Sequence, residues 1–352
     1  MKSSQPRIAV IVPSYKVRAH IAKVIQRIGP EVERIYAVDD KCPEGSGDFI
    51  EQTCKDPRVV VIRNAENQGV GGTVMAGYRA AIADGMEILV KVDGDGQMDA
   101  ALIPQLVAPI VQGVADYTKG NRFYSPEALD GMPTGRLLGN AGLSFFTKLS
   151  SGYWDVLDPT NGFTAIHALV ADVLPLQKVA KRYFFESDLL FRLNTVRAVV
   201  VDIPMFSVYG TERSNFRAGA MIFPFFWKNL VNFWKRVLYA YFLRGFSFAS
   251  FCLLFGMALF LYGMAFGSIA WIASAGSGEP TPVGTVMLAV VPLILGFQLL
   301  MGFFAADIAS VPSRALHQAL SIRPAKPLQP FSDVEQARSG GGSSRSSSVR
   351  VR

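Results

Sequence analysis

The apolar run Met86-Glu-Ile-Leu-Val-Lys-Val92 is followed directly by Asp93-Gly-Asp95-Gly-Gln97, and this junction decides the fold. The apolar run predicts a buried strand with the polar residues at its carboxyl end. Carboxylates two positions apart on extended backbone point to the same side, and the glycines leave room for a ligand. Two carboxylates and an amide offer the oxygen ligands that Mg²⁺ or Mn²⁺ prefers, although a plain polar turn would show the same residues.

Residues 7–216 of the 352-residue chain alternate β-rich runs with helical stretches. The β-rich runs cover residues 8–12, 34–38, 59–62 and 88–92, and helical stretches such as 19–28 and 73–84 separate them. This alternation predicts an α/β domain with a mostly parallel sheet and helices on both faces. Ligands bind such sheets at the carboxyl ends of the strands, where Pro13-Ser-Tyr15, Asp39-Asp40 and residues 93–97 would meet.

Two uncharged runs, residues 245–278 and 280–306, follow the sheet region. Each is long enough to cross a hydrocarbon core, which needs about 20 apolar residues. The segment around their junction, residues 274–282, is rich in Gly, Ser and Pro. We therefore expect a transmembrane hairpin. The alternative is a pair of buried helices in a large soluble core.

Basic residues flank both uncharged runs, whereas the segment between the runs carries only Glu279. They are Arg217, Lys228, Lys235, Arg236 and Arg244 on one side and Arg314, Arg323 and Lys326 on the other. The positive-inside rule then predicts a multi-pass integral membrane protein with its sheet domain in the cytoplasm. Anionic lipid accounts for the net charge of +7, and no nucleic-acid partner is needed. The three cysteines show no metal-ligand or disulfide spacing.

Residues 223–239 place aromatic and aliphatic side chains among Lys, Arg and Asn at helical spacing. This pattern is typical of a helix in the membrane interface, and an ordinary packing helix is the alternative. We expect four regions: a sheet domain over residues 1–216, an amphipathic interface segment over 217–244, the hairpin over 245–312, and a largely disordered cytoplasmic tail over 313–352.

A series of short motifs across residues 8–165 resembles the family-2 (GT-A) glycosyltransferases. Within that family it resembles the polyprenyl-phosphate sugar synthases of the dolichol-phosphate mannose or glucose synthase kind. The motifs are Val10-Ile-Val-Pro13-Ser-Tyr15, Val38-Asp39-Asp40, Asn67-Gln-Gly69, Val92-Asp93-Gly-Asp95-Gly-Gln97, Lys119-Gly-Asn-Arg122 and Asp158-Pro-Thr-Asn-Gly162-Phe163.

The resemblance implies a GT-A fold and a role for each matching residue. The nucleotide-sugar donor would be held by Pro13, Tyr15, Asp39, Asp40 and Asp93. Asp95 and Gln97 would hold Mg²⁺ or Mn²⁺ against the diphosphate. The acceptor phosphate would be met by Arg122, Arg136, Arg213 and Ser214, the last two in a segment that departs from the pattern of the family. The catalytic residues would then be Asp93, Asp95, Arg122 and Arg136.

Three further features of the sequence lie outside these motifs. Asp188 of Glu186-Ser-Asp188, on a predicted helix over residues 184–193, is a candidate catalytic base for a hydroxyl acceptor, and a solvated helix face is the alternative. The glycines of Gly69-Val-Gly-Gly72 favour a close-packed helix start over a phosphate loop. The histidines, which are His20, His167 and His317, are interpreted as surface or packing residues, with no zinc site.

The expected activity is metal-dependent, inverting transfer of a sugar from a nucleotide-sugar to polyprenyl (undecaprenyl or dolichyl) phosphate at the cytoplasmic membrane face. The alternative is a membrane glycosyltransferase that acts on a hydroxyl in cell-envelope glycan or glycolipid synthesis. A non-catalytic membrane tether is a third class, and the intact Asp93, Asp95 and Gln97 argue against it. A homo-oligomer is compatible with each of these functions.

Overall fold

A computed structural model describes residues 5–124, 134–205 and 218–322 of the chain. Its sheet domain contains the strands β1 (Ile8–Ser14), β2 (Val32–Asp39), β3 (Val59–Arg63), β4 (Ile88–Lys91), β5 (Tyr117–Asn121), β6 (Thr164–His167) and β7 (Val200–Pro204). The strand order is β3-β2-β1-β4-β6-β5-β7. Only β6 runs antiparallel to its two neighbours, so the predicted mostly parallel sheet is confirmed.

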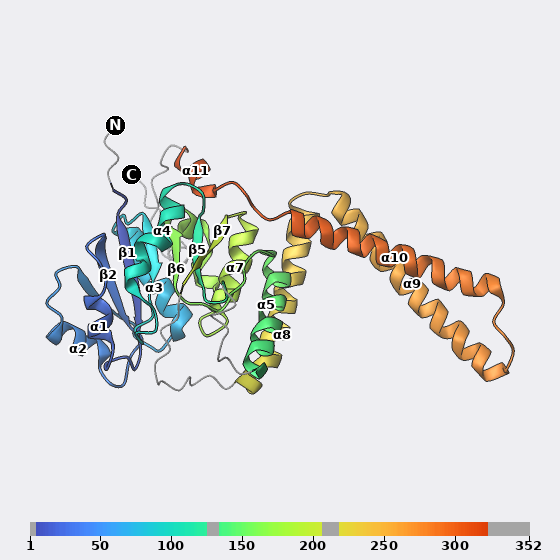
Figure 1. Ribbon diagram of the computed structural model, residues 1–352, viewed down its shortest axis with the longest axis horizontal. Coiled ribbons are helices and arrows are strands. Elements are labelled where there is room, and N and C mark those ends of the chain that lie inside the picture. Colours follow the sequence, from blue (N-terminus) through green and yellow to red (C-terminus); the bar gives the residue numbers. More distant parts are fainter. Residues whose placement is uncertain (1–4, 125–133, 206–217, 323–352) are drawn as a thin grey trace, which may run out of the picture.

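Helices cover both faces of this sheet (Figure 1). They are α1 (Ile21–Gln26), α2 (Ser46–Thr53), α3 (Gly69–Ala83), α4 (Ile103–Val111), α5 (Thr134–Ser151), α6 (Ala168–Val173) and α7 (Phe185–Thr195), with the short turns η1 (Ala100–Leu102) and η3 (Leu176–Lys178). Successive residues of a strand point to opposite faces. Ala9 and Ile11 of β1 therefore pack toward α3, α6 and α7, whereas Val10 and Val12 pack toward α1 and α4.

Helix α8 (Ala218–Leu238) packs along α5 and stands between the sheet and the rest of the chain (Figure 1). One face is buried through residues such as Phe225, which meets the ring of Phe184 edge-on. Its other face exposes Phe223, Trp227, Trp234 and Leu238, which recur at helical spacing. The amphipathic helix expected here is therefore present, with an aromatic stripe left exposed.

Two long helices, α9 (Phe248–Ser277) and α10 (Val283–Ala309), form the hairpin that projects from the sheet domain (Figure 1). Both are long and apolar enough to cross a membrane, with mean hydropathies of 2.0 and 2.3 in their most apolar windows. Only 33% and 11% of these windows are buried, so the alternative of core helices in a soluble protein is not observed. The helices cross closely at Gly296, where a side-chain carbon would come within 2.8 Å of the Phe260 Cα atom.

A buried carboxylate fastens the hairpin to the sheet domain. Asp307, near the end of α10, is fully buried and binds the guanidinium of Arg236 through two hydrogen bonds of 2.6 and 2.9 Å. The Tyr241 hydroxyl and the Trp154 indole also donate to it. Tyr241 lies in η4 (Tyr239–Leu243), the turn that continues α8. We call this group the hairpin clamp: Asp307, Arg236, Tyr241 and Trp154.

The first part of the predicted tail contains a helix, α11 (Leu316–Ser321), which docks on the sheet domain. Asp116 accepts hydrogen bonds from the backbone nitrogens of Leu316 and His317 and binds the His317 ring at 2.7 Å. The His317 ring also stacks on that of His167, at 4.4 Å between centroids. The two histidines are thus packing residues, as predicted, but they are not isolated from one another. The proposed boundary at 216–217 and residues 323–352 lie outside the described residues.

Candidate active site

The acidic loop, residues 93–97, lies where the carboxyl ends of β1, β2 and β4 meet. Ser14 and Asp39 are paired in the β1–β2 register, and Val92 N donates to Ile11 O at 3.0 Å. A side-chain carbon on Gly94 would lie 3.2 Å from Pro13 O, so the acidic loop packs directly against the end of β1. Tyr15 stands beside this junction with 42% of its surface exposed. The structure thus brings Pro13, Asp39 and the acidic loop together, as the strand order requires.

Asp39 shapes the loop that follows β2. Its Oδ1 accepts from Cys42 N at 2.7 Å and its Oδ2 from Gly47 N at 2.6 Å. These contacts join β2 to the first turn of α2, and Asp39 itself is largely buried. Any contact with a nucleoside would therefore come from a carboxylate that the backbone already holds in place.

Asp40, which the resemblance places at the donor, is held by hydrogen-bond donors of the protein itself. It is 2% exposed, and both of its oxygens are occupied. Oδ1 accepts from the Asn64 amide and from Gln68 N, and Oδ2 from Gly69 N, all at 2.8 Å. The carboxylate thus binds backbone donors at the start of α3, where negative charge is favourable. This contact also explains the Asn67-Gln-Gly69 motif, and it confirms that Gly69 opens a close-packed helix.

Asp95 and Gln97 are the residues whose chemistry fits a divalent cation. Asp95 is half-buried, Gln97 is exposed, and Asp95 Oδ1 accepts from Gln97 N at 3.0 Å. In the part of the chain that the structure describes, no three His, Cys, Asp or Glu side chains gather into a protein-only metal site. Mg²⁺ and Mn²⁺ sites that share a substrate phosphate need only one or two carboxylates, so this oxygen donor set fits such an ion.

A buried ionic cluster lies directly beneath Asp93, and the sequence reasoning missed most of it. Lys91 is 1% exposed, and its Nζ atom lies 2.7 Å from Asp93 Oδ1 and 3.8 Å from Glu186 Oε1. Burial alone would lower the pKa of Lys91, but the carboxylates of Asp93 and Glu186 outweigh burial and raise it. Burial raises the pKa of Glu186 to about 7. The sequence did offer one signal of this cluster, because Lys91 is the single basic residue in the apolar strand run 86–92.

A second buried lysine, Lys119 of β5, completes this floor. Burial lowers the pKa of Lys119 to about 8, and its ammonium donates to Asn161 O. The loop that contains Asn161 packs closely against Asp93. This close approach is possible because Gly162 has no side chain. A Cβ atom on Gly162 would meet Lys91 Nζ and lie 2.6 Å from Asp93 Oδ2. We call this group the donor floor: Lys91, Asp93, Lys119, Asn161, Gly162 and Glu186.

Arg122, expected at the acceptor phosphate, is held by a buried carboxylate. Its Nε and Nη2 atoms donate to the two oxygens of Asp158 at 2.7 and 3.0 Å. Asp158 is fully buried, whereas the Arg122 side chain keeps 27% of its surface exposed. The pair joins the end of β5 to the loop before Gly162. Any phosphate contact would therefore use a guanidinium whose charge is largely balanced.

Asp188, the candidate base, points away from the acidic loop into a structural network. One oxygen accepts from Ala180 N and Arg192 Nε, and the other accepts from the Asn232 amide of α8. Both Asp188 and Glu186 are largely buried, so the solvated-face alternative is also wrong. Two residues along a helix differ in direction by about half a turn, and it is Glu186 that turns toward Lys91.

The side chains of the other residues predicted to contact the acceptor phosphate lie outside the described part of the structure. Arg136 belongs to α5, but only its backbone is described. Arg213 and Ser214 lie outside the described residues.

Comparisons with known proteins agree with this geometry. Residues 9–174 match the family model described as Glycosyl transferase family 2. A UDP-N-acetylglucosamine–dolichyl-phosphate N-acetylglucosaminyltransferase of Methanococcus voltae is 29% identical over 236 residues, which are 62% of this chain and 92% of that protein. An undecaprenyl-phosphate mannosyltransferase of Micrococcus luteus is 27% identical over 203 residues, which are 56% of this chain and 82% of that protein.

Among solved structures, the chain is similar to glucosyl-3-phosphoglycerate synthase from Mycobacterium tuberculosis, with 18% identity and a TM-score of 0.47 over 66% of this chain and 80% of that one. Mannosyl-3-phosphoglycerate synthase from Rubrobacter xylanophilus gives 16% identity and a TM-score of 0.49 over 66% and 74%. The predicted family and fold are confirmed by the family match and by the observed sheet. The chain carries a glycosyltransferase family 2 domain with a GT-A-like α/β fold, and the protein is a glycosyltransferase.

Proposed function

We propose that the protein transfers a sugar from a nucleotide-sugar to a polyprenyl phosphate at a membrane surface. The observation that carries this proposal is the joining, in one chain, of the acidic loop with the aromatic stripe of α8 and the hairpin. The relatives named as dolichyl-phosphate and undecaprenyl-phosphate transferases support the same acceptor class. An acceptor with a long apolar tail stays in the bilayer, so the enzyme must come to it.

The donor would lie across the ends of β1 and β4. Tyr15 offers an exposed ring for the base, and Asp39 offers a carboxylate held in place by two backbone donors. Asp93, the partly exposed member of the donor floor, would meet the sugar and diphosphate. Asp95 and Gln97 would hold Mg²⁺ or Mn²⁺, which supplies positive charge to the departing nucleotide diphosphate.

The donor floor would keep Asp93 oriented and its surroundings electrically balanced. Lys91 binds Asp93 from below, where water has no access to the ammonium group. A carboxylate that is already bound and oriented loses little entropy when the donor arrives. The negative charge of Asp93 is thus balanced before binding, and the cation at Asp95 would balance that of the diphosphate.

The attack would be a single inverting displacement by the lipid phosphate oxygen on the anomeric carbon. A phosphate monoester is anionic near neutral pH and needs no strong base, which agrees with the absence of a suitably directed Asp188. A hydroxyl acceptor would need a base. For that alternative the candidate base is Glu186, which lies in the donor floor beside Lys91. Burial raises the pKa of its carboxyl to about 7.

The membrane arrangement follows from charge and from the aromatic stripe. The stripe of α8 would lie at headgroup depth, and the hairpin would cross the bilayer. The basic residues around both ends of the hairpin, and Glu279 alone in its loop, favour a cytoplasmic catalytic domain. An impermeant thiol reagent should then label a cysteine placed at Gly278 only from outside the cell. Labelling of that cysteine from the cytoplasmic side alone would contradict this orientation.

The activity can be tested with the purified full-length protein in an uncharged detergent. A panel of nucleotide-sugars is offered with Mn²⁺ and either a short polyprenyl phosphate or a glycolipid with a free hydroxyl. We expect a sugar-phosphate-lipid product that mild acid cleaves, with the sugar linkage inverted. Transfer to the glycolipid without any product on polyprenyl phosphate would favour the hydroxyl-acceptor alternative.

A further inference from the structure

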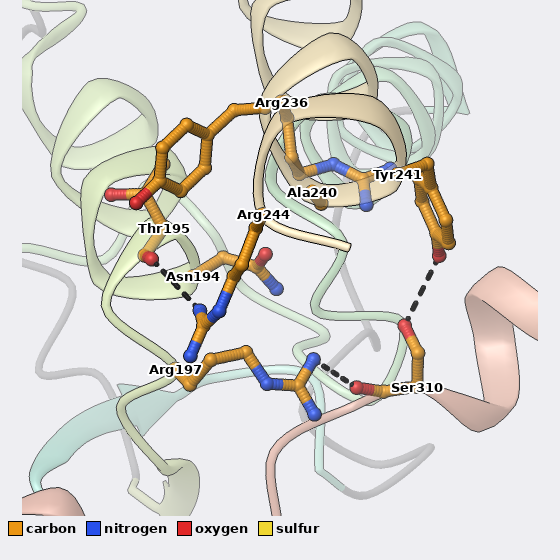
Figure 2. A pocket seen from close by; sticks show the side chains of 9 residues that line it. Asn194, Thr195, Arg197, Arg236, Ala240, Tyr241, Arg244 and Ser310 are labelled. Carbon is orange, nitrogen blue, oxygen red and sulfur yellow. Dashed lines mark hydrogen bonds between the residues drawn. The ribbon is translucent and has the colours of Figure 1, made fainter. Parts of the chain in front are cut away.

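A basic pocket lies where the hairpin joins the sheet domain, and the proposed transfer reaction does not use it. The pocket has a volume of about 230 Å³ and lies between the end of α7, the end of α8 with η4, and the end of α10. Figure 2 shows Arg197, Arg244 and Asn194 around the space, with Ser310 of the segment after α10 opposite them.

Two of the three arginines in this pocket carry charge that no carboxylate balances. Arg236 is paired with Asp307 in the hairpin clamp. Arg197 donates to Ser310 O, and Arg244 donates to Thr195 O at 3.2 Å, so both bind only neutral carbonyls. The pocket lining contains no acidic residue, and no ion pair of Arg197 or Arg244 is found within the described ranges. Two guanidinium groups therefore converge on a small space that lacks an anion.

A buried amide points to a ligand independently of this charge. Asn194 is 6% exposed and lines the pocket. Its side chain makes no hydrogen bond to any described residue, and Figure 2 shows its amide between the two arginines. The amide opens onto the pocket, so it can hydrogen-bond a polar group that enters this space.

The depth of the pocket identifies the kind of anion. η4 lies five residues before α9, and Ser310 directly follows α10, so the pocket stands at the polar end of both proposed spans. The neighbouring Leu243, Phe246 and Phe248 are all exposed apolar side chains. Phosphate groups of lipids lie at this depth of a bilayer, and apolar side chains beside the pocket would meet their acyl chains.

We propose that this pocket binds the phosphate group of an anionic phospholipid. A guanidinium fork matches phosphate oxygens, and the Asn194 amide adds a neutral donor. The volume suits a headgroup better than a whole drug-sized ligand. The pocket is separate from the transfer site, because Glu186 and Thr195 are nine residues apart along α7, or about 14 Å. The bound lipid would bridge the sheet domain and the hairpin.

The test uses full-length protein in uncharged detergent, without donor, titrated with a short-chain phosphatidylglycerol that carries a fluorophore. The double variant Arg197→Gln/Arg244→Gln should weaken binding at least about tenfold, because two charge-assisted contacts are lost. Lys235→Gln removes an exposed cation of α8 outside the pocket and should leave the affinity unchanged. Equal affinities of the double variant and the wild type would overturn the proposal.

A second pair of variants guards against a folding defect at the junction. Ala240 lines the pocket, so Ala240→Glu adds a repelling charge while both arginines stay, and Ala240→Gln is its uncharged match. We expect the glutamate variant alone to lose phosphatidylglycerol. Displacement of the probe by an equal concentration of inorganic phosphate would show a free-phosphate site. Displacement by polyprenyl phosphate, together with a raised KM for it in the arginine variants, would assign the pocket to the acceptor. Either result would overturn the phospholipid assignment.

Discussion

The donor floor and the hairpin clamp are both buried ionic groups, yet they differ in how completely their charges are satisfied. In the clamp, Asp307 accepts four hydrogen bonds from three side chains and pairs with one arginine. In the donor floor, two lysines face Asp93 and Glu186, and the pKa values of Glu186 and Lys119 are shifted to about 7 and 8 by burial. A buried ion pair whose hydrogen bonds are all made holds the parts of the protein in one arrangement. Ionisable groups with shifted pKa values are instead typical of active sites.

The largest effect should come from breaking the hairpin clamp. Asp307→Ala would leave Arg236 buried without its counter-charge, and such losses cost about 3–5 kcal/mol of folding free energy. We expect a large drop in the thermal unfolding midpoint of the full-length protein in detergent. The double variant Arg236→Met/Asp307→Leu, which removes both charges, should recover much of that stability. A stable Asp307→Ala protein would show that the clamp contributes little.

The next largest effect should be on catalysis alone. Asp95→Ala removes the carboxylate proposed to hold the divalent cation, and the transfer rate should fall about 100-fold to 1,000-fold. Excess chelator should produce a similar loss in the wild type. The unfolding midpoint should change little, because the Asp95 side chain accepts a local hydrogen bond from Gln97 N within the same loop.

Asp99→Ala provides a matched control for that variant. Asp99 lies four residues further along and its side chain only accepts from Ala101 N at the start of η1. Its variant should keep most of the activity. Full transfer by Asp95→Ala, or full transfer in chelator, would remove the metal from the mechanism.

The sequence predicted the regular parts of this site because they depend on local patterns. The strands over 8–12, 34–38, 59–62 and 88–92 and the acidic loop follow from apolar runs and from the residues that end them. Parallel strand order then brings Pro13, Asp39 and Asp93 together without further information. The two apolar hairpin helices could also be predicted from the sequence, since their length and composition are local properties.

The sequence could not show the contacts of a side chain or helix that depend on a distant partner. Asp40 was assigned to the donor, but the donors at the start of α3 lie 28 and 29 residues away. Asp188 and Glu186 lie two positions apart on α7, so they point in different directions. The contact of Asp188 with Asn232 of α8 could not be seen in the local sequence. α11 is six residues long and shows no periodicity of its own. Its docking depends on Asp116, about 200 residues earlier, which no local pattern reveals.

The pH dependence of stability tests the donor floor. Burial raises the pKa of Glu186 from 4.5 to about 7. Between these values the folded state holds a proton that the unfolded state has released, so stability falls as the pH rises through this window. Glu186→Gln should remove this part of the decline, which amounts to roughly 1–3 kcal/mol. The measurement is the unfolding midpoint of both proteins from pH 4.5 to 7.5.

The exposed Glu66 serves as the control for this measurement, since Glu66→Gln should keep the wild-type slope. Burial also raises the pKa of Asp202 to about 6, so part of the decline should remain in both proteins. An equally steep decline in Glu186→Gln and the wild type would show that the carboxyl of Glu186 is not held neutral by its surroundings.

The smallest predicted effect tests whether Lys91 acts as the counterpart of Arg236. Both cations are buried beside a carboxylate, at 2.7 Å in the Lys91–Asp93 pair and 2.6 Å in the Arg236–Asp307 pair. The partners differ, because the Asp93 side chain is 29% exposed and can be solvated when its lysine is lost, whereas Asp307 is fully buried. Lys91→Met should therefore lower the folding free energy by only about 1 kcal/mol. It should slow transfer about tenfold, since Asp93 would lose its orientation, and the pH profile of the rate should shift as Glu186 loses a neighbouring positive charge. Arg236→Met should show the opposite pattern, with a large loss of stability and a near-normal rate in the protein that remains folded. Equal losses of stability in the two variants would mean that the donor floor is a second structural clamp, and Lys91 would then have no positioning role in transfer.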